Sequence, residues 1–159
     1  MRRVLLLVAA GVLLGVGIFL ALGEEDVDGP PPEAAVEIGG ATVRADVADD
    51  EASRRRGLAG RAGLDDDEGM LFLLPDDSPA FWMKGMRFPI DIVWIDDGRV
   101  VDVTADVPPP RESESHTALP TYSPGRPANR ALEVNAGWAA RHGVTRGDVV
   151  RVRRDGASG

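Results

Sequence analysis

Short apolar stretches separated by turn-forming residues recur along the chain from residue 34 onward. Residues 35–38 and 41–47 flank two glycines, a pattern that predicts a β-hairpin. In the second of these stretches, apolar and charged residues alternate, which indicates a strand with one face in water. By the same reasoning, further strands are predicted at residues 69–74, 80–84, 90–95, 99–107, 131–134 and 149–153.

Two short helices interrupt this series of strands. Asp49 or Asp50 can cap a helix over residues 51–56, and Asn135 can cap a second helix through residues 138–142. A glycine follows each of these segments, as is common at the end of a helix. About eight short strands with two short helices predict a mainly β domain, folded as a compact sandwich or barrel.

The N-terminal part has a different character. Residues 4–22 carry no charge and lie between two arginines and a group of acidic residues. As a helix this run would reach about 28 Å, close to the ~30 Å core of a bilayer. We therefore expect an uncleaved single-pass anchor in the cell membrane, with the C-terminal domain outside. A cleaved signal peptide is the alternative, and would give a secreted protein.

These patterns divide the chain into four parts. They are a signal-anchor or transmembrane helix (1–23), a linker rich in proline, glycine and acidic residues (24–34), the β domain (35–154) and a disordered tail (155–159).

The charge of the chain excludes some partners. The net charge is −8, and the part beyond Gly23 carries all 26 acidic residues and 16 of the 18 basic ones. Such an acidic surface argues against nucleic acid as a partner. Many acidic residues with a single lysine are also typical of proteins adapted to high salt, so we expect a halophile-like surface. The chain has no cysteine, which excludes disulfides and thiolate metal sites.

Several motifs follow one another in the order of a known family. They are Gly-Met-Leu-Phe at 69–72, Trp-Met-Lys at 82–84, Pro-Ile-Asp at 89–91 and Ala-Leu-Glu-Val at 131–134. Together they resemble the domain of unknown function 192 family, over about residues 35–153. The resemblance implies the fold better than the function, because the role of this family is not established. Two positions depart from the family pattern: Gly85 replaces the usual Asn, and Ala59 replaces a frequent Met.

Lys84 is the only lysine among 18 basic residues, and it is the first candidate for a site. In a strand over residues 80–84, Trp82 and Lys84 would share one face, which permits a cation–π contact. Asp91 lies in an apolar run and needs a partner if it is buried. Three interpretations stay open: a buried Lys84–Asp91 ion pair that stabilises the bend, a small polar pocket walled by Trp82 and Trp94, or an exposed lysine without a particular role.

Glu133 completes the set, because a carboxylate in an apolar strand is rarely left unpaired. Arg56 or Arg130 is its expected partner. The candidate ligand-binding residues are therefore Lys84, Trp82, Asp91, Glu133, Arg56 and Trp94. We expect the domain to bind a small polar ligand or a partner protein; the alternative is an enzyme that uses Lys84, Asp91 and Glu133 in a polar cleft.

No metal or cofactor is expected. The two histidines, His116 and His142, lie far apart in the sequence and do not have the spacing of metal ligands. The acidic run at 65–68 lacks the spaced ligands of a calcium loop.

Overall fold

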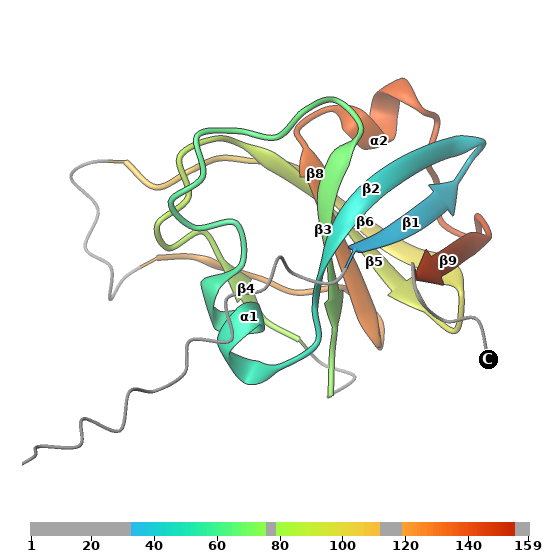
Figure 1. The fold of residues 1–159 in the computed structure, drawn as a ribbon, viewed down its shortest axis with the longest axis horizontal. Coiled ribbons are helices and arrows are strands. Elements are labelled where there is room, and N and C mark those ends of the chain that lie inside the picture. Colours follow the sequence, from blue (N-terminus) through green and yellow to red (C-terminus); the bar gives the residue numbers. More distant parts are fainter. Residues whose placement is uncertain (1–32, 76–78, 112–118, 155–159) are drawn as a thin grey trace, which may run out of the picture.

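The computed structural model describes residues 33–75, 79–111 and 119–154, and it is mainly β (Figure 1). The elements in these residues are β1 (Glu33–Ile38), β2 (Ala41–Ala48), α1 (Glu51–Arg56), β3 (Glu68–Leu73), β4 (Phe81–Trp82), β5 (Ile90–Asp96), β6 (Arg99–Val107), β7 (Thr121–Tyr122), β8 (Arg130–Asn135), α2 (Trp138–Arg141) and β9 (Val150–Arg154). The predicted fold class is confirmed, and so is the first hairpin, because β1 pairs with β2 in antiparallel register.

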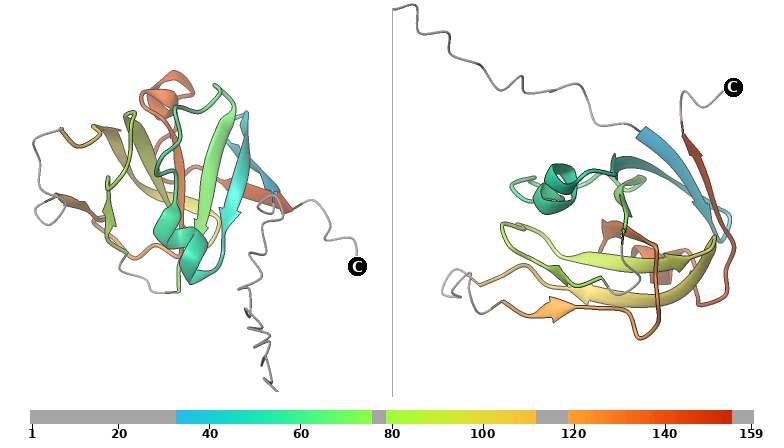
Figure 2. Two further views of the ribbon diagram at one scale, coloured as in Figure 1. Left: turned by 60° about the vertical axis from the view of Figure 1, so that its left-hand side comes forward. Right: turned by 90° about the horizontal axis from the view of Figure 1, so that it is seen from below.

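Seven of the strands form one strongly curled sheet, and β4 and β7 form a separate two-stranded sheet (Figure 2). The order in the large sheet is β6-β5-β8-β3-β2-β1-β9. All neighbours are antiparallel except β2 and β3, which are parallel because the chain passes through α1 between them. The sheet curls so far that its two edges touch, where Arg99 bridges to Val149. The domain is therefore a half-barrel rather than a flat sandwich.

Successive residues along the central strands point to opposite faces of the sheet, and each face has its own hydrophobic core. Leu71 and Leu132 belong to a first core, which also contains Trp138 of α2. Phe72 and Ala131, their neighbours in the sequence, belong to a second core on the opposite face of the sheet. Because α1 and the β4–β7 sheet lie over this second face, it is where the chain outside the main sheet can form a pocket (Figure 2).

The N-terminus of α1 agrees with the prediction. The Asp50 side chain accepts a hydrogen bond from the Ser53 backbone N–H at 2.8 Å, and Ser53 Oγ accepts one from the Asp50 N–H in return. Gly57 follows the helix with a positive φ of 50°. This reciprocal pair satisfies donors that an isolated helix would leave open.

Two local predictions were wrong. Asn135 does not cap α2; its side chain donates to the carbonyls of Leu64 and Asp65, and Gly137 stands at the cap position. The strand predicted over residues 80–84 is only Phe81–Trp82, because a turn begins directly after it: Met86 N–H donates to the Met83 carbonyl. Lys84 therefore lies in a turn and not in a strand.

The predicted anchor (1–23), almost all of the predicted linker and the predicted tail (155–159) lie outside the described residues. Within residues 33–75, 79–111 and 119–154, no helix is long and apolar enough to cross a membrane.

Candidate functional site

Asp91 is buried in the core and has a structural role. Its carboxylate accepts hydrogen bonds from three backbone N–H groups: Asp106 at 2.9 Å, Gly137 at 3.1 Å and Ala139 at 3.0 Å. Two of these donors belong to the start of α2, where helix N–H groups have no partner within the helix. Asp91 therefore fixes α2 against β5, and this explains why a fully buried carboxylate is tolerated in an apolar strand.

Lys84 is exposed and lies on the indole of Trp82. Its Nζ is 5.2 Å from the centroid of the Trp82 ring, which is a cation–π distance. Among the described residues, Lys84 forms no ion pair with Asp91, so the predicted buried pair is wrong. The reason is the turn after β4, which keeps Lys84 at the surface while the N–H groups around α2 satisfy Asp91.

The turn also brings together the two positions that depart from the family pattern. Gly85 has a φ of 75°, a conformation that glycine and asparagine adopt more readily than other residues. A Cβ atom at Gly85 would lie 3.1 Å from the Cβ of Ala59. The two positions that depart from the family pattern are thus in contact, and both keep small residues at this point.

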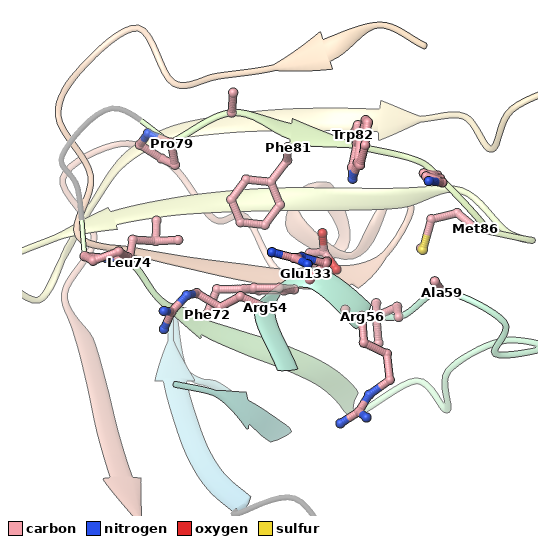
Figure 3. A pocket seen from close by; sticks show the side chains of 16 residues that line it. Arg54, Arg56, Ala59, Phe72, Leu74, Pro79, Phe81, Trp82, Met86 and Glu133 are labelled. Atoms are coloured by element: carbon pink, nitrogen blue, oxygen red, sulfur yellow. The ribbon is translucent and has the colours of Figure 1, made fainter. Parts of the chain in front are cut away.

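A pocket of about 310 Å³ opens beside this turn, on the face of the second core (Figure 3). Phe81 and Trp82 of β4 lie on one side of it, and Phe72 of β3 lies on the other side with Arg54 and Arg56 of α1 (Figure 3). Leu74 and Pro79 lie toward one end, while Met86 and Ala59 lie toward the other; Lys84 also lines it (Figure 3). The volume falls at the low end of the range for small-molecule sites.

Glu133 lies between the two sides of the pocket (Figure 3). It is in the middle of β8, opposite Met70 of β3 and Ile92 of β5, and only 6% of its surface is exposed. Neither Arg56 nor Arg130 pairs with it, and no other residue that the structure describes forms a hydrogen bond or ion pair with its carboxyl group. Burial among apolar side chains raises the pKa of Glu133 from 4.5 to about 8. At neutral pH the group is therefore mostly a neutral acid, which can donate one hydrogen bond.

The basic residues around the pocket differ in whether they already have a partner within the protein. Arg54 donates to the carbonyls of Asp49 at 2.7 Å and Leu73 at 3.2 Å. Arg55 is paired with Glu51 one helical turn away. Arg56 and Lys84 also line the pocket, and within the described part of the chain neither is paired with a carboxylate. Two cations are thus available at the rim.

The second tryptophan of the motif is not a pocket wall. Trp94 is fully buried, and its indole N–H donates to the hydroxyl of Thr104 at 2.8 Å. Its ring packs edge-on against Phe81 at 5.1 Å between centroids. Trp94 therefore supports the wall that Phe81 forms.

The structure thus brings Trp82, Lys84, Arg56 and Glu133 to one pocket and separates Asp91 and Trp94 from it. The enzyme alternative relied on Asp91 in the same cleft as Lys84 and Glu133, and this arrangement is not formed. Phe72 and Phe81 pack against each other at 4.9 Å between ring centroids, and both also line the pocket. The three consecutive arginines at 54–56 were the only signal in the sequence for the α1 side of the site.

Metal ligands do not gather here: no group of three or more His, Cys, Asp or Glu residues that could hold an ion occurs in the described ranges. His116 lies outside those ranges, and the His142 ring packs against Trp138 at 4.6 Å.

The fold and the pocket together define a curled β domain with an amphipathic pocket on the face that α1 and β4 cover. The chain belongs to the DUF192 family, described as "Uncharacterized ACR", which it matches over residues 34–152. The predicted family is thereby confirmed.

Two solved structures are similar to this domain. A protein of unknown function from Novosphingobium aromaticivorans DSM 12444 is 32% identical, with a TM-score of 0.65; the match covers 75% of this chain and 83% of that one. A protein from Sinorhizobium meliloti 1021, described as "a putative transcription regulator", is 26% identical with a TM-score of 0.69, over 79% of this chain and 97% of that one. No curated protein matches the chain.

Proposed function

We propose that this domain binds a small, partly apolar ligand in the pocket between α1, β3 and β4. The observation that carries the proposal is Glu133, a carboxyl group that is 6% exposed and has no hydrogen-bonding partner among the described residues, although it faces a pocket of about 310 Å³. Burying a polar group without a partner costs free energy, and a bound ligand that forms the missing hydrogen bond recovers part of it.

The walls of the pocket support the same proposal. Trp82 is a large hydrophobic side chain with 50% of its surface exposed, in contrast to the fully buried Trp94. An exposed indole beside a polar group is a typical feature of binding surfaces, because it offers a large apolar contact area at a small entropic cost.

A DNA-binding role does not follow from the S. meliloti relative. The net charge of −8 would repel a phosphate backbone, whereas proteins that bind DNA gain affinity by neutralising phosphates.

A further part of the proposal is the location. We propose that residues 4–22 anchor the protein in the cell membrane, so that the pocket faces outward. The uncharged run between two arginines and an acidic segment supports this proposal. Alkaline extraction of membranes from the native host tests it, together with protease digestion of intact cells. Recovery of the chain in the soluble fraction, or full protection from the protease, would contradict it.

The binding proposal is tested by fluorescence and thermal shift with the full-length protein in detergent. A fragment library of aromatic and aliphatic acids, amides and amines is screened, and Trp82→Phe identifies which change in fluorescence comes from Trp82. Ala59→Phe should fill the pocket and reduce binding at least tenfold, because Ala59 lines it. Ala52→Phe, on the exposed part of α1 and outside the pocket, is the matched control. Equal binding by both variants, or no binding fragment at all, would reject the proposal.

A further inference from the structure

We infer that the ligand is a planar organic anion that also carries an uncharged hydrogen-bond acceptor, with the anionic group at Lys84 and the acceptor at the neutral carboxyl of Glu133. This inference rests on the proposed function, since it names the chemical class that the same pocket takes. It is carried by the positions of three kinds of side chain along the pocket.

The first kind is the cations at the rim. The charged residues that line the pocket are Arg54, Arg55, Arg56, Lys84 and Glu133, and all except Glu133 are basic. Arg54 and Arg55 are committed to backbone carbonyls and to Glu51. Lys84 and Arg56 therefore supply positive charge that nothing in the described residues neutralises. An anionic group gains a charge-assisted contact there, and a cationic group would be repelled.

The second kind is the aromatic rings. Phe72 and Phe81 meet edge to face at 4.9 Å with an angle of 79° between their planes, and Trp82 continues the wall toward the rim (Figure 3). A planar group placed against these rings can stack on one of them and make an edge contact with another. Since Lys84 lies beside Trp82 at the rim, the planar body is held with its charged group outward.

The third kind is the carboxyl group at the floor. The neighbours of Glu133 across the sheet are apolar, Met70 on β3 and Ile92 on β5, and the side chains from β4 that face it are aromatic. The other charged residues that line the pocket are the arginines of α1 and Lys84 after β4, and all of them are basic. Cations alone would favour the ionised form, but desolvation by the apolar neighbours outweighs them and raises the pKa of Glu133 to about 8. The neutral acid donates a hydrogen bond to an acceptor such as a carbonyl.

An organic amine is the competing class, because aromatic rings with a carboxylate can bind ammonium groups. It would require Glu133 to be ionised in apolar surroundings and would bring a cation past Lys84 and Arg56. Desolvation of Glu133 opposes the first requirement, and the positive charges at the rim oppose the second.

The test uses four benzene derivatives and calorimetric titration of the full-length protein. The probes are 4-acetylbenzoate, 4-acetylbenzamide, 4-acetylbenzylamine and 4-isopropylbenzoate. They keep the ring and change only the charged group or the acceptor. We expect 4-acetylbenzoate to bind about tenfold more tightly than each of the others. Each of the others lacks either the anionic group or the acceptor, and about tenfold in affinity is the effect of losing one hydrogen bond in a partly dry site.

Variants separate the contributions of the two ends. Lys84→Gln should reduce the affinity for 4-acetylbenzoate about tenfold. Arg87→Gln is the matched control, because it also removes one positive charge, three residues away and outside the pocket. With the native protein, affinity should fall about tenfold per pH unit above about 8, where Glu133 loses its proton. Glu133→Gln, which keeps an N–H donor, should abolish this pH dependence, and Glu133→Met should weaken binding below pH 8, where the native carboxyl group is protonated.

The outcomes distinguish the two proposals. Tightest binding of the benzylamine, lost in Glu133→Gln, would overturn the inference about the ligand class and leave the pocket as a binding site. The inference about the ligand class would also be overturned if none of the four probes binds, while other fragments bind to the native protein and not to the Ala59→Phe variant. Absence of any ligand for the pocket would reject the proposed function itself.

Discussion

The ammonium of Lys84 lies 5.2 Å from the centroid of the Trp82 ring, at the rim of the pocket, while the carboxylate of Asp91 accepts three backbone N–H groups in the core. These two residues are seven positions apart in a motif of the family, yet they act in different places. Asp91 holds α2 in position, and Lys84 contributes to the surface that can meet a ligand.

This separation predicts the result of a double-mutant cycle on the free energy of unfolding. Asp91→Ala should cost at least about 3 kcal/mol, because it leaves buried N–H groups without an acceptor. Lys84→Met should change stability by less than about 1 kcal/mol, since only an exposed cation–π contact is lost. The coupling between the two changes should be close to zero. A coupling above about 1 kcal/mol in chemical denaturation would show that the two side chains interact after all.

The stability of the domain should depend on pH through Glu133. Its pKa is raised from 4.5 to about 8 on folding, so between these values the unfolded chain loses a proton that the folded protein keeps. Stability is therefore greatest below pH 4.5 as far as this group is concerned, and it falls by about 1.4 kcal/mol per pH unit until the folded protein also ionises near pH 8.

Glu133→Gln is the variant that isolates this effect, because it removes the titration and keeps the shape. The difference in unfolding free energy between the variant and the native protein should grow by several kcal/mol from pH 5 to pH 8, in favour of the variant. Denaturant unfolding at pH 5, 6.5 and 8 measures it. A difference that is constant over this range would mean that Glu133 is not protonated in the folded state.

Much of the fold follows from the alternation of apolar and polar residues. The hairpin of β1 and β2, the α1 helix with its Asp50 cap, and the strands β3, β5, β6 and β8 were predicted close to their observed bounds. The curl of the sheet could not be predicted from the pattern, because it depends on which distant strands pair. The same is true of the contact between its edges at Arg99 and Val149.

The site was predictable only in part, for a related reason. Glu133 stands out as an acid in an apolar strand, and Lys84 and Trp82 stand out by their rarity and spacing. The partners of Asp91 are backbone N–H groups at residues 106, 137 and 139, and backbone donors leave no signal in side-chain chemistry. Phe72 is a buried core residue, and its sequence environment indicates only this role. That Phe72 also lines the pocket depends on residues that are distant in the sequence.

The acidic composition predicts that stability depends on salt. With a net charge of −8, the chain repels itself at low ionic strength, and salt screens this repulsion over a Debye length of about 10 Å at 0.1 M. We expect the melting temperature to rise when sodium chloride is increased from dilute to molar concentration. A melting temperature that does not change over this range would contradict the prediction of a halophile-like surface.

The domain should fold without the N-terminal segment. All the strands of the curled sheet lie between Glu33 and Arg154, and β1 and β9, near the two ends of this range, pair with each other. We expect a chain of residues 33–154 to show protected amides in β3, β5 and β8 in hydrogen exchange, as the full-length protein does. Rapid exchange throughout the shorter chain would place essential contacts in the residues that were removed.

The most direct test of the central claim is the titration of the Glu133 carboxyl carbon by NMR, in the free protein and with saturating 4-acetylbenzoate. The assignment comes from Glu133→Gln, in which the signal is missing. The account predicts that the pKa of Glu133 is about 8 in the free protein, because the group is buried without a partner. The pKa should be higher in the complex, because the protonated carboxyl group donates a hydrogen bond to the ligand. A pKa near the ordinary 4.5 in both states would show that Glu133 is an ionised group, and would contradict the account of the pocket given above.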